Sequence, residues 1–478
     1  MTWVSRDVAF DLERWLEVAE AVATSRGWPR SEVGGTRASV VCLHSSLRSE
    51  LGRWTVVAAD PVAVVEGDCG EVRLRARDAS GGFVEVGRFA DPFDAVAAML
   101  APWSEPDGGE DDGFRGGAIG VFGYGCRRAL ERLPAEGAAV SSGEPDVWFG
   151  LYSTFLCRDA RSQTSQLVSR GLHTWGEAPS QAVAEACVAA WAEALDGADG
   201  LAPELPPAWP TLSPAVTPEA YQVAFERVMA AIAEGVIYQG CLTFPLVGPR
   251  GEQTAASLFR RLLREHPAPF ASLLVPDAPI AMAGGSPERF LSIHRGRARV
   301  RPMKGTRPRH ADAAEDLRLR DALASSPKDR AENVMIVDLM RNDLGRVCRL
   351  GTVSTPTLFE VESYASVHQM TSTVEGVLMD PADPVSAIRA CFPPGSMTGA
   401  PKVSAMDLLG HLEVHRRGWY AGVHGWIDLG ARVELSVVIR SALVGPEVVR
   451  WHVGGGIVAD STGAGEWQEA LDKCPLRR

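Results

Sequence analysis

The sequence lacks the features that would direct a chain into a membrane or out of the cell. No apolar stretch reaches the roughly 18 residues that a membrane-spanning helix needs. The opening segment, MTWVSRDVAFDLERW, is acidic and contains no apolar core of a signal peptide. The nine cysteines are an odd number without a CxxC pair, so no disulfide framework is expected. We therefore expect a cytoplasmic protein with reduced thiols and no membrane partner.

Positive charge and histidine are also scarce. The chain carries 48 lysine and arginine residues against 60 aspartate and glutamate residues, a formal net charge of −12. This balance argues against nucleic acid as a partner, and it means that an anionic substrate would need a local basic pocket. The ten histidines form no cluster with the spacing of metal ligands. The remaining composition, 46% hydrophobic and 23% charged, is that of an ordinary globular protein.

The composition divides the chain into three parts. Residues 1–195 are predicted to form an N-terminal unit, with early strands at Ser39–His44 and Trp54–Ala58. Residues 196–217 are rich in proline and are predicted to be a linker. Residues 218–478 would then form a catalytic domain, and no internal repeat is present.

The last part combines helices with strands. Apolar residues at helical spacing predict a helix over Pro218–Gly235. Ser325 or Ser326 as a cap, followed by Pro327, predicts the start of a helix that runs to Gly345. Further strands, and lastly a helix, are predicted at Ile237–Leu246, Ala271–Leu274, Phe290–Val300, Val433–Leu443, Val448–Val453 and Gly465–Lys473.

The run RPMKGTRPR, which starts at Arg301, is the most informative segment for function. It places the amine of Lys304 and the hydroxyl of Thr306 among arginines, and Gly305 would let the backbone approach a ligand. The alternating residues before it predict a β-hairpin, with the run at the end of a strand. Nearby positive charges disfavour the ammonium form of a lysine and so favour a nucleophile. The alternative is a solvated basic turn.

Two pairs of carboxylates lie three residues apart, which places both members of a pair on one helix face. One pair is Asp329 and Glu332, and the other is Glu466 and Glu469, with Lys473 one turn further on. Mg²⁺ needs one or two carboxylates and takes its remaining oxygens from water and substrate. The alternative is a pair of solvated helices with a Glu–Lys ion pair.

Other segments are ambiguous when taken alone. The small residues of GSMTGAPK, from Gly395 to Lys402, could receive a carboxylate, but the spacing is not that of a Walker A loop. Gly454–Gly456 would let backbone amides approach a ligand. Arg440, at the end of a predicted strand, suits a carboxylate or a structural ion pair equally. His368 is equally compatible with a core or a site position.

Taken together, these motifs resemble the chorismate-utilising enzymes. The resemblance covers about Glu219–Lys473 and rests on SPERF, PMKGTRPR, KDRAENVMIVDLMRNDLGRV, GSMTGAPK, HRRGWYAG, ELSVVIRS, GGGIVADS and EWQEALDK. It implies the α+β fold of anthranilate synthase component I, an antiparallel β-sheet sandwich wrapped by helices. The active site would lie in the cleft between the layers.

Two positions sort the chain among the activities of this family. Gln239 replaces the lysine that activates water in isochorismate and salicylate synthases, which points to amination by ammonia. Lys304 replaces the alanine usual in anthranilate synthases and resembles aminodeoxychorismate synthase component I. Anthranilate synthase component I is the alternative, although it would need a pyruvate elimination that Lys304 should disfavour. Gln369 stands where anthranilate synthases usually carry a histidine, and the segment YQGCLTFPL departs from the commoner YQVNL. An idle relative kept as a binding subunit is a further alternative.

The resemblance implies a reaction with chorismate and ammonia. Lys304 would add at C2 of chorismate while Glu288 protonates the departing C4 hydroxyl, and ammonia would then add at C4 and expel the lysine. The product would be 4-amino-4-deoxychorismate, for para-aminobenzoate and folate or for a specialised aminoarene pathway. The chain contains no recognisable glutaminase motif, so a separate glutamine amidotransferase subunit is expected as partner.

The resemblance also implies the binding residues. Glu332 and Glu469 would bind Mg²⁺, with Glu466 and Asp329 orienting its waters. The contacts with the substrate would come from Thr306, Gln239, Tyr420, Arg440, Lys473 and the amides of Gly454 and Gly456.

Overall fold

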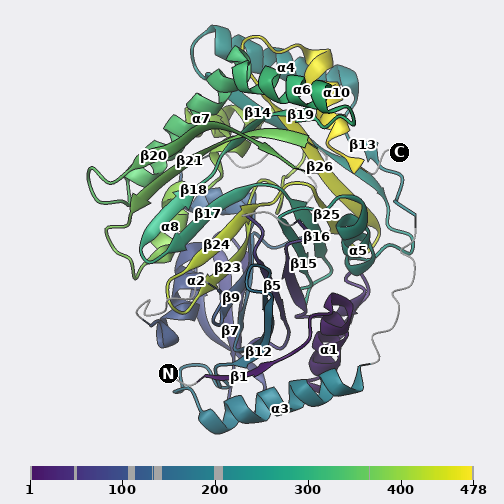
Figure 1. Ribbon diagram of the computed structural model, residues 1–478, viewed down its shortest axis with the longest axis vertical. Helices are drawn as coiled ribbons and strands as arrows, with labels where there is room; N and C mark the ends of the chain where they lie inside the picture. Colours follow the sequence, from purple (N-terminus) through teal and green to yellow (C-terminus); the bar gives the residue numbers. More distant parts are fainter. Residues whose placement is uncertain are drawn as a thin grey trace.

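Two antiparallel β-sheets of twelve strands each form the centre of the computed structural model (Figure 1). The structure describes residues 3–47, 51–105, 113–131, 133, 143–198, 208–364 and 367–475. No helix in these ranges is long and apolar enough to cross a membrane.

The first sheet is built mainly from strands at the start, the middle and the end of the chain. In spatial order its strands are β1 (Val4–Asp7), β12 (Thr164–Ser169), β11 (Thr154–Asp159), β5 (Trp54–Ala58), β4 (Val41–His44), β15 (Phe270–Leu274), β16 (Ala281–Ser286), β25 (Ser441–Val444), β26 (Val448–Ile457), β14 (Gln239–Pro249) and β13 (Ser213–Pro214). The short β22 (Gly399–Ala400) also pairs with β14.

The second sheet has the same mixed origin. Its order is β19 (Met303–Pro308), β21 (Val367–Val377), β18 (Arg297–Val300), β17 (Arg289–His294), β24 (Val433–Val437), β23 (Val423–Asp428), β9 (Gly117–Phe122), β10 (Val147–Tyr152), β6 (Ala63–Asp68), β7 (Glu71–Arg77) and β8 (Phe83–Phe89). The long β20 (Ser354–Ser363) pairs with β21. A separate ribbon joins β2 (Arg30–Ser31) and β3 (Thr36–Arg37).

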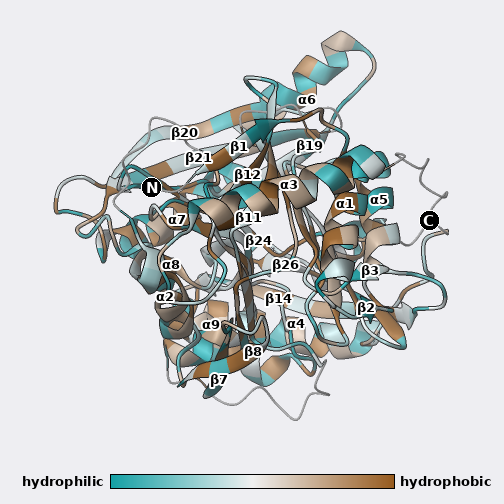
Figure 2. Cartoon of the chain, turned by 90° about the horizontal axis from the view of Figure 1, so that it is seen from below, coloured by the Kyte–Doolittle hydropathy of each residue, from teal (hydrophilic) through white to brown (hydrophobic). Residues whose placement is uncertain are grey.

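Helices cover the outer faces of both sheets. They are α1 (Leu12–Ser25), α2 (Pro92–Leu100), α3 (Gln181–Gly197), α4 (Pro218–Ala233), α5 (Ala255–Glu265), α6 (Ala313–Ser325), α7 (Pro327–Gly345), α8 (Pro384–Cys391), α9 (Lys402–Leu412) and α10 (Gly463–Asp472). In Figure 1, α4 and α10 lie over β14 and β26 at the top of the view, while α3 crosses the bottom. Figure 2 shows α1 and α3 from below, each with hydrophobic and hydrophilic segments.

The apolar core has one layer between the sheets and one under the helices of each outer face. The middle layer combines residues of the first sheet, such as Val56 and Leu274, with Ile119 and Trp148 of the second. The helices α1, α3, α4, α5 and α10 cover the first sheet, and α2, α7 and α8 cover the second. This arrangement confirms the predicted α+β sandwich wrapped by helices.

Both sheets contain strands from residues 1–195 and from residues 218–478. The strand β9 lies between β23 and β10, and β4 pairs with β15. The two predicted units therefore share both sheets. The boundaries of the predicted division stay a prediction, and nine residues of the predicted linker, 199–207, lie outside the described residues.

Two predicted elements differ from the structure. The predicted strand Val433–Leu443 is two strands, β24 and β25, which belong to different sheets. The chain changes sheet next to Arg440, whose φ of +52° interrupts the extended conformation. The predicted basic run at the end of a strand is itself the edge strand β19, because it pairs with β21.

Candidate functional site

Residues from both sheets meet beside Gly456. A Cβ atom added to this glycine would lie 2.4 Å from Gln239 Nε2 and 3.4 Å from Lys304 Nζ. Gly456 and Gln239 belong to β26 and β14 of the first sheet, whereas Lys304 belongs to β19 of the second. The absence of a side chain at position 456 is what lets the amide and the amine approach each other across the sandwich.

The side-chain amide of Gln239 has no hydrogen-bond partner in the part of the chain that the structure describes. The residue is 1% exposed, and neither Nε2 nor Oε1 makes a hydrogen bond to the described residues. A buried amide without partners is costly. We infer that this amide is available to a polar ligand beside Lys304.

The arginines around Lys304 do not form an anion pocket. Each is paired with a carboxylate on a neighbouring element, so its charge is compensated locally. The pairs are Arg299–Glu375 at 2.9 Å, Arg301–Glu362, Arg307–Asp329 at 2.8 Å and Arg309–Asp316 at 2.8 Å. The prediction that free arginines activate the lysine and bind an anion is therefore wrong, because strand pairing and helix packing bring acids to them.

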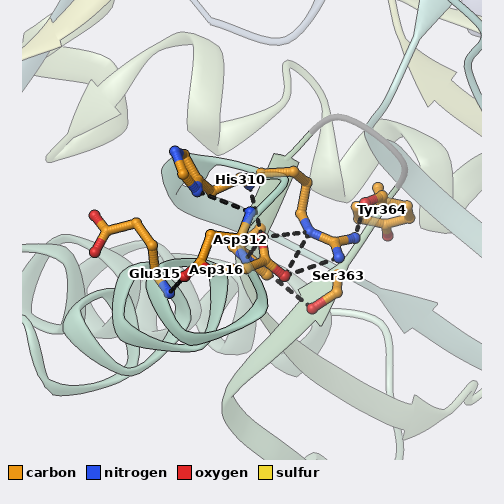
Figure 3. A network of polar contacts seen from close by, with 8 residues as sticks. His310, Asp312, Glu315, Asp316, Ser363 and Tyr364 are labelled. Carbon is orange, nitrogen blue, oxygen red and sulfur yellow. Dashed lines mark hydrogen bonds and ion pairs between the residues drawn. The ribbon is translucent and has the colours of Figure 1, made fainter.

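Figure 3 shows Asp316, the carboxylate of the last of these pairs, in its surroundings. Asp316 also accepts hydrogen bonds from the backbone N–H of His310 at 2.9 Å and lies 3.0 Å from His368 Nε2. His368 is buried, and its Nδ1 lies 2.8 Å from Ser363 Oγ. Both ring nitrogens are therefore engaged, and this network holds α6 against β20 and β21.

Gly305 serves packing rather than the approach of a ligand. Its φ is +78°, and a Cβ atom there would lie 2.8 Å from both Asp329 Oδ1 and Leu323 Cδ1. The helices α6 and α7 therefore occupy the space beside this glycine. The sequence correctly indicated a close approach but not the group that makes it.

Glu288 lies where the chain passes from β16 of the first sheet to β17 of the second. Its carbonyl oxygen accepts a hydrogen bond from Val437 N at 3.0 Å, and Ser286 Oγ accepts one from Glu288 N at 3.3 Å. The second place where the chain changes sheet, next to Arg440, lies beside it. There Gly285 N donates a hydrogen bond to Arg440 O at 2.9 Å. These bonds fix the backbone that carries the carboxyl group.

The chemistry of Glu288 follows from its burial. The residue is 5% exposed, and Oε1 has no hydrogen-bond partner among the described residues. Burial raises the pKa of Glu288 to about 7, although the Ser396 hydroxyl and the charge of Lys304 oppose the shift. A carboxyl group of this kind is partly protonated near neutral pH and can act as a general acid.

Carboxylates from α7 and α10 approach the same place. Burial raises the pKa of Glu332, and the charges of Asp329 and Glu466 act in the same direction, against Lys304 and Lys328. Glu466 is buried, and its Oε1 accepts a hydrogen bond from Ser461 Oγ at 2.6 Å. Glu332 and Glu466 therefore lie within electrostatic reach of each other.

Glu469 is more open to solvent than the other two predicted ligands. Its side chain is 62% exposed and lies 2.9 Å from Lys473 Nζ. Burial would raise the pKa of Glu469, but the charge of Lys473 and its hydrogen bond hold this pKa below the ordinary value. Glu469 is therefore an ionised carboxylate at the rim of the site.

These acids fit a cation that shares its ligands with a substrate. The described part of the chain contains no group of three or more His, Cys, Asp or Glu side chains that could hold a metal by itself. Two carboxylates completed by water and substrate oxygens are the usual way in which Mg²⁺ is bound. The donor set therefore suits such an ion.

The remaining predicted substrate contacts are dispersed around the glycines of β26. Lys473 Nζ donates to Gly454 O at 2.8 Å, and Arg440 Nη1 donates to Lys473 O at 2.9 Å. A Cβ atom at Gly454 would lie 2.5 Å from Leu242 O, so this glycine is required by strand packing. Tyr420 is buried, and its ring stacks on His452 with centroids 5.0 Å apart.

Thr306 and the GSMTGAPK segment differ in their exposure. Thr306 is exposed and faces Gln369 across the strand pair. Lys402, the lysine of the segment, is largely buried and donates to Asp343 at 2.6 Å, so it is structural. The structure does not place it beside Lys304.

Two polar groups near the site are not evident from residue types alone. Ser396 lies beside Glu288, inside GSMTGAPK. Arg417, inside HRRGWYAG, is 1% exposed and donates to Glu413 at 2.7 Å and to Cys241 O at 2.8 Å. Their place in recurring motifs is the only signal in the sequence that could have pointed to them.

Two cavities lie away from Lys304 and Glu288. One of about 1550 Å³ is lined by residues of both sheets, among them Trp54, Arg289 and His424. A smaller one of about 430 Å³ lies between α1 and α3 beside Asp60 and Arg77. Neither is lined by Lys304 or Glu288.

The solved structure of anthranilate synthase component I from Streptococcus pneumoniae resembles this fold, with a TM-score of 0.75. It is 25% identical, and the match covers 90% of this chain and 94% of the other. A menaquinone-specific isochorismate synthase from Escherichia coli shares the fold at 17% identity and a TM-score of 0.68, over 100% of this chain and 94% of the other.

Sequence relatives with curated names are more similar. Aminodeoxychorismate synthase component 1 of Klebsiella aerogenes is 38% identical over 386 residues, 80% of this chain and 81% of the relative. Aminodeoxychorismate synthase of Streptomyces griseus is 39% identical over 372 residues, 76% of this chain and 50% of the relative, so the match spans about half of that protein. Anthranilate synthase component 1 of Mycolicibacterium smegmatis is 35% identical over 398 residues, 80% of this chain and 75% of the relative.

A model of one protein family matches residues 47–475. This range contains Gln239, Glu288, Lys304, Glu332 and Gly456, the residues that the fold brings together. The chain therefore belongs to the family of chorismate binding enzymes.

Proposed function

We propose that this chain is an aminodeoxychorismate synthase component that aminates chorismate with ammonia. The observation that carries the proposal is the meeting of Lys304 Nζ with the unpartnered amide of Gln239 at Gly456. An amine can form a covalent bond to the ring, whereas a glutamine amide cannot activate water as a base. The names of the Klebsiella and Streptomyces griseus relatives support the same activity.

The proposed reaction begins with covalent attack by the lysine. The free amine of Lys304 adds at C2 of chorismate, the two ring double bonds shift from C1=C2 and C5=C6 to C1=C6 and C4=C5, and the C4 hydroxyl leaves as water with a proton from Glu288. The pKa of Glu288, about 7, keeps part of this carboxyl protonated for that step. Ammonia then adds at C4, both double bonds shift back, and Lys304 leaves C2 as the free amine. The proton that ammonia releases restores Glu288.

Mg²⁺ is the proposed cofactor. Glu332 and Glu469 would hold it, with Glu466 and Asp329 orienting its waters, and when bound it would act as a Lewis acid on the ring carboxylate. Arg307 already pairs with Asp329, and Lys473 with Glu469. We expect the chain's own lysines and arginines to compensate these acids while no cation is bound.

A glutamine amidotransferase subunit is the proposed partner. The designation "component 1" of the Klebsiella relative supports a second component. Glutamine hydrolysis needs an accessible, activated thiolate. None of the nine cysteines is exposed, and burial raises the pKa even of the half-buried Cys69 to about 11. We therefore assign ammonia production to another chain, and we place the reaction in the cytoplasm.

The remaining contacts are proposed for the substrate carboxylates and ring. They would come from Thr306, Tyr420, Arg440, Lys473 and the amides of Gly454 and Gly456. Beyond Trp451, β26 is paired with β14 but no longer with β25, so one edge of this glycine segment borders the site.

The decisive experiment identifies the product. Purified full-length chain is incubated with chorismate, Mg²⁺ and an ammonium salt, and the product is identified by mass spectrometry and chromatography. We expect 4-amino-4-deoxychorismate, and no product after EDTA treatment. Anthranilate as the main product would establish the alternative activity. The Mycolicibacterium relative carries the name of that activity.

A further inference from the structure

One buried hydrogen bond between side chains joins the helix α7 to the strand β21. Ser372 Oγ donates to Asn333 Oδ1 at 2.5 Å, and both residues are fully buried. The neighbouring buried residues of α7 are apolar, namely Ile336, Val337 and Met340. Asn333 is therefore a polar contact in an otherwise apolar part of the interface between helix and sheet.

The hydroxyl of Ser372 is itself held in place. The backbone N–H of Phe359 in β20 donates to Ser372 Oγ at 3.1 Å. Phe359 has a φ of +59°, which is unusual for a bulky side chain, and Arg330 of α7 lies 4.4 Å from the centroid of its ring. Because the hydroxyl accepts one hydrogen bond and donates another, its direction toward Asn333 is defined.

Stability alone does not explain an asparagine at this position. Asn333 Nδ2 is inaccessible and has no hydrogen-bond partner among the described residues. An unpaired buried donor costs at least as much as one hydrogen bond gains. A leucine of similar volume would avoid that cost. A single buried polar contact can, however, fix the register of two packed elements that apolar contacts leave free to shift.

The residue whose position depends on this register is Glu332, which precedes Asn333. Successive residues of a helix point about 100° apart, so the rotation of α7 sets the direction of Glu332 toward Lys304 and Glu466. The other polar contact at this end of α7, Asp329 with Arg307, is partly open to solvent, with the arginine side chain 34% exposed. The buried ion pair of Asp343 with Lys402 lies near the far end of the helix. Exposed ion pairs of this kind contribute little.

We propose that Asn333 and Ser372 are positioning residues that direct Glu332 toward the divalent-cation site. The inference rests on the proposed function, because it needs a cation at Glu332. It assigns to the buried bond a role in metal affinity rather than in folding.

The test is the affinity of the full-length chain for Mn²⁺, measured by electron paramagnetic resonance with and without chorismate. Asn333→Leu should raise the dissociation constant about 10- to 100-fold, as expected for a group that orients a metal ligand, while Tm stays at or above that of the wild type. Ser372→Ala should act in the same direction, and Ser372→Thr, which keeps the hydroxyl, should restore most of the affinity. The double variant should lose no more than the Asn333→Leu variant.

Ile336→Val is the matched control, since Ile336 lies on the same buried face one turn further on. It should lower Tm and leave the dissociation constant for Mn²⁺ unchanged. An Asn333→Leu variant with unchanged Mn²⁺ affinity, or with a loss explained by a lower Tm, would overturn the positioning role. Product formation by the wild type is scored separately, so a failure of the proposed activity can be told from a failure of this inference.

Discussion

The carboxyl group of Glu288 lies where water cannot stabilise its charge. Burial raises its pKa to about 7. Backbone hydrogen bonds hold the residue in place where the chain passes between the two sheets. On the opposite sheet, Lys304 projects from an edge strand whose arginines are already paired. At this scale the proposed reaction depends on one acid and one amine, and each can be tested by itself.

Glu288→Gln should reduce the rate of amination about 10²- to 10⁴-fold, the usual contribution of a general acid. With the wild type, activity should fall as the pH rises above about 7, because the carboxyl must carry a proton to donate it. Steady-state rates from pH 6 to 9 with ammonium salt at a constant concentration of free ammonia check both expectations. A variant that keeps the wild-type rate and pH profile would exclude Glu288 as the acid.

The same substitution should not destabilise the protein at alkaline pH. The pKa of Glu288 is higher in the folded chain, so the folded state holds the proton more tightly. The free energy of unfolding therefore decreases as the pH rises from about 4.5 to 7 and stays lower above that range. Because glutamine carries no charge to bury, Tm of the variant at pH 8 should equal or exceed that of the wild type. A large drop in Tm would mean that the carboxyl has a structural partner.

Lys304→Ala should abolish a covalent adduct with the ring, whereas Lys304→Arg keeps the positive charge without a nucleophilic amine. Intact-protein mass spectra, recorded with chorismate and Mg²⁺ but no ammonia, should show the adduct in the wild type alone. We expect both variants to lose C4 amination. If the arginine variant aminated chorismate at near wild-type rate, Lys304 would contribute only charge.

At the scale of elements, β26 combines two tasks. Its register with β14 continues to Ile457, which places Gly456 opposite Cys241 and beside the ends of Gln239 and Lys304. Nearer its start it pairs with β25, which follows the change of sheet at Arg440. The strand therefore connects the sheet interior to the candidate site.

Gly456→Ala should impair activity more than stability. The new Cβ would lie 2.4 Å from Gln239 Nε2, the far end of a flexible side chain, so Gln239 must move away and the chain can still fold. We expect a large loss of kcat/KM with a small change in Tm. Gly445→Ala is the control, because a Cβ there meets only Val448 O at 3.5 Å, and it should leave both quantities unchanged. Equal effects of the two substitutions would remove the special role of Gly456.

At the scale of the whole molecule, both parts of the chain complete the same two sheets. Without residues 1–198, β15 would lose its neighbour β4 and β23 would lose β9, which exposes strand edges in both layers. The layer of core between the sheets would lose residues such as Ile119 and Trp148.

We therefore expect a fragment of residues 208–478 not to fold, although it contains every predicted catalytic residue. Circular dichroism should show no cooperative thermal transition, and chorismate should not be converted. Co-expression of residues 1–198 with residues 208–478 is the control and should restore both. A fragment that unfolds cooperatively without its complement would show that the C-terminal part is an independent domain.

The sequence by itself determined the family and most of the local elements, and it indicated candidate residues for the chemistry. Cap residues and apolar periodicity depend on neighbouring positions, which is why α7 begins at Pro327 behind its Ser326 cap as predicted. Motifs such as PMKGTRPR report on chemistry for the same local reason. What they cannot report is which charges meet, because partners far apart in the chain are set by strand pairing and helix packing.

Only the tertiary structure showed that the arginines beside Lys304 pair with carboxylates and that Val433–Leu443 is divided between two sheets. It also showed that the space beside Gly305 is filled by α6 and α7 and not by a ligand. Glu288 is buried because the chain passes from one sheet to the other at this residue, and burial raises its pKa. No local sequence pattern reveals that passage. The physical reason is the same in each case. Burial and electrostatic environment are properties of the space around a residue, and that space is filled by distant parts of the chain.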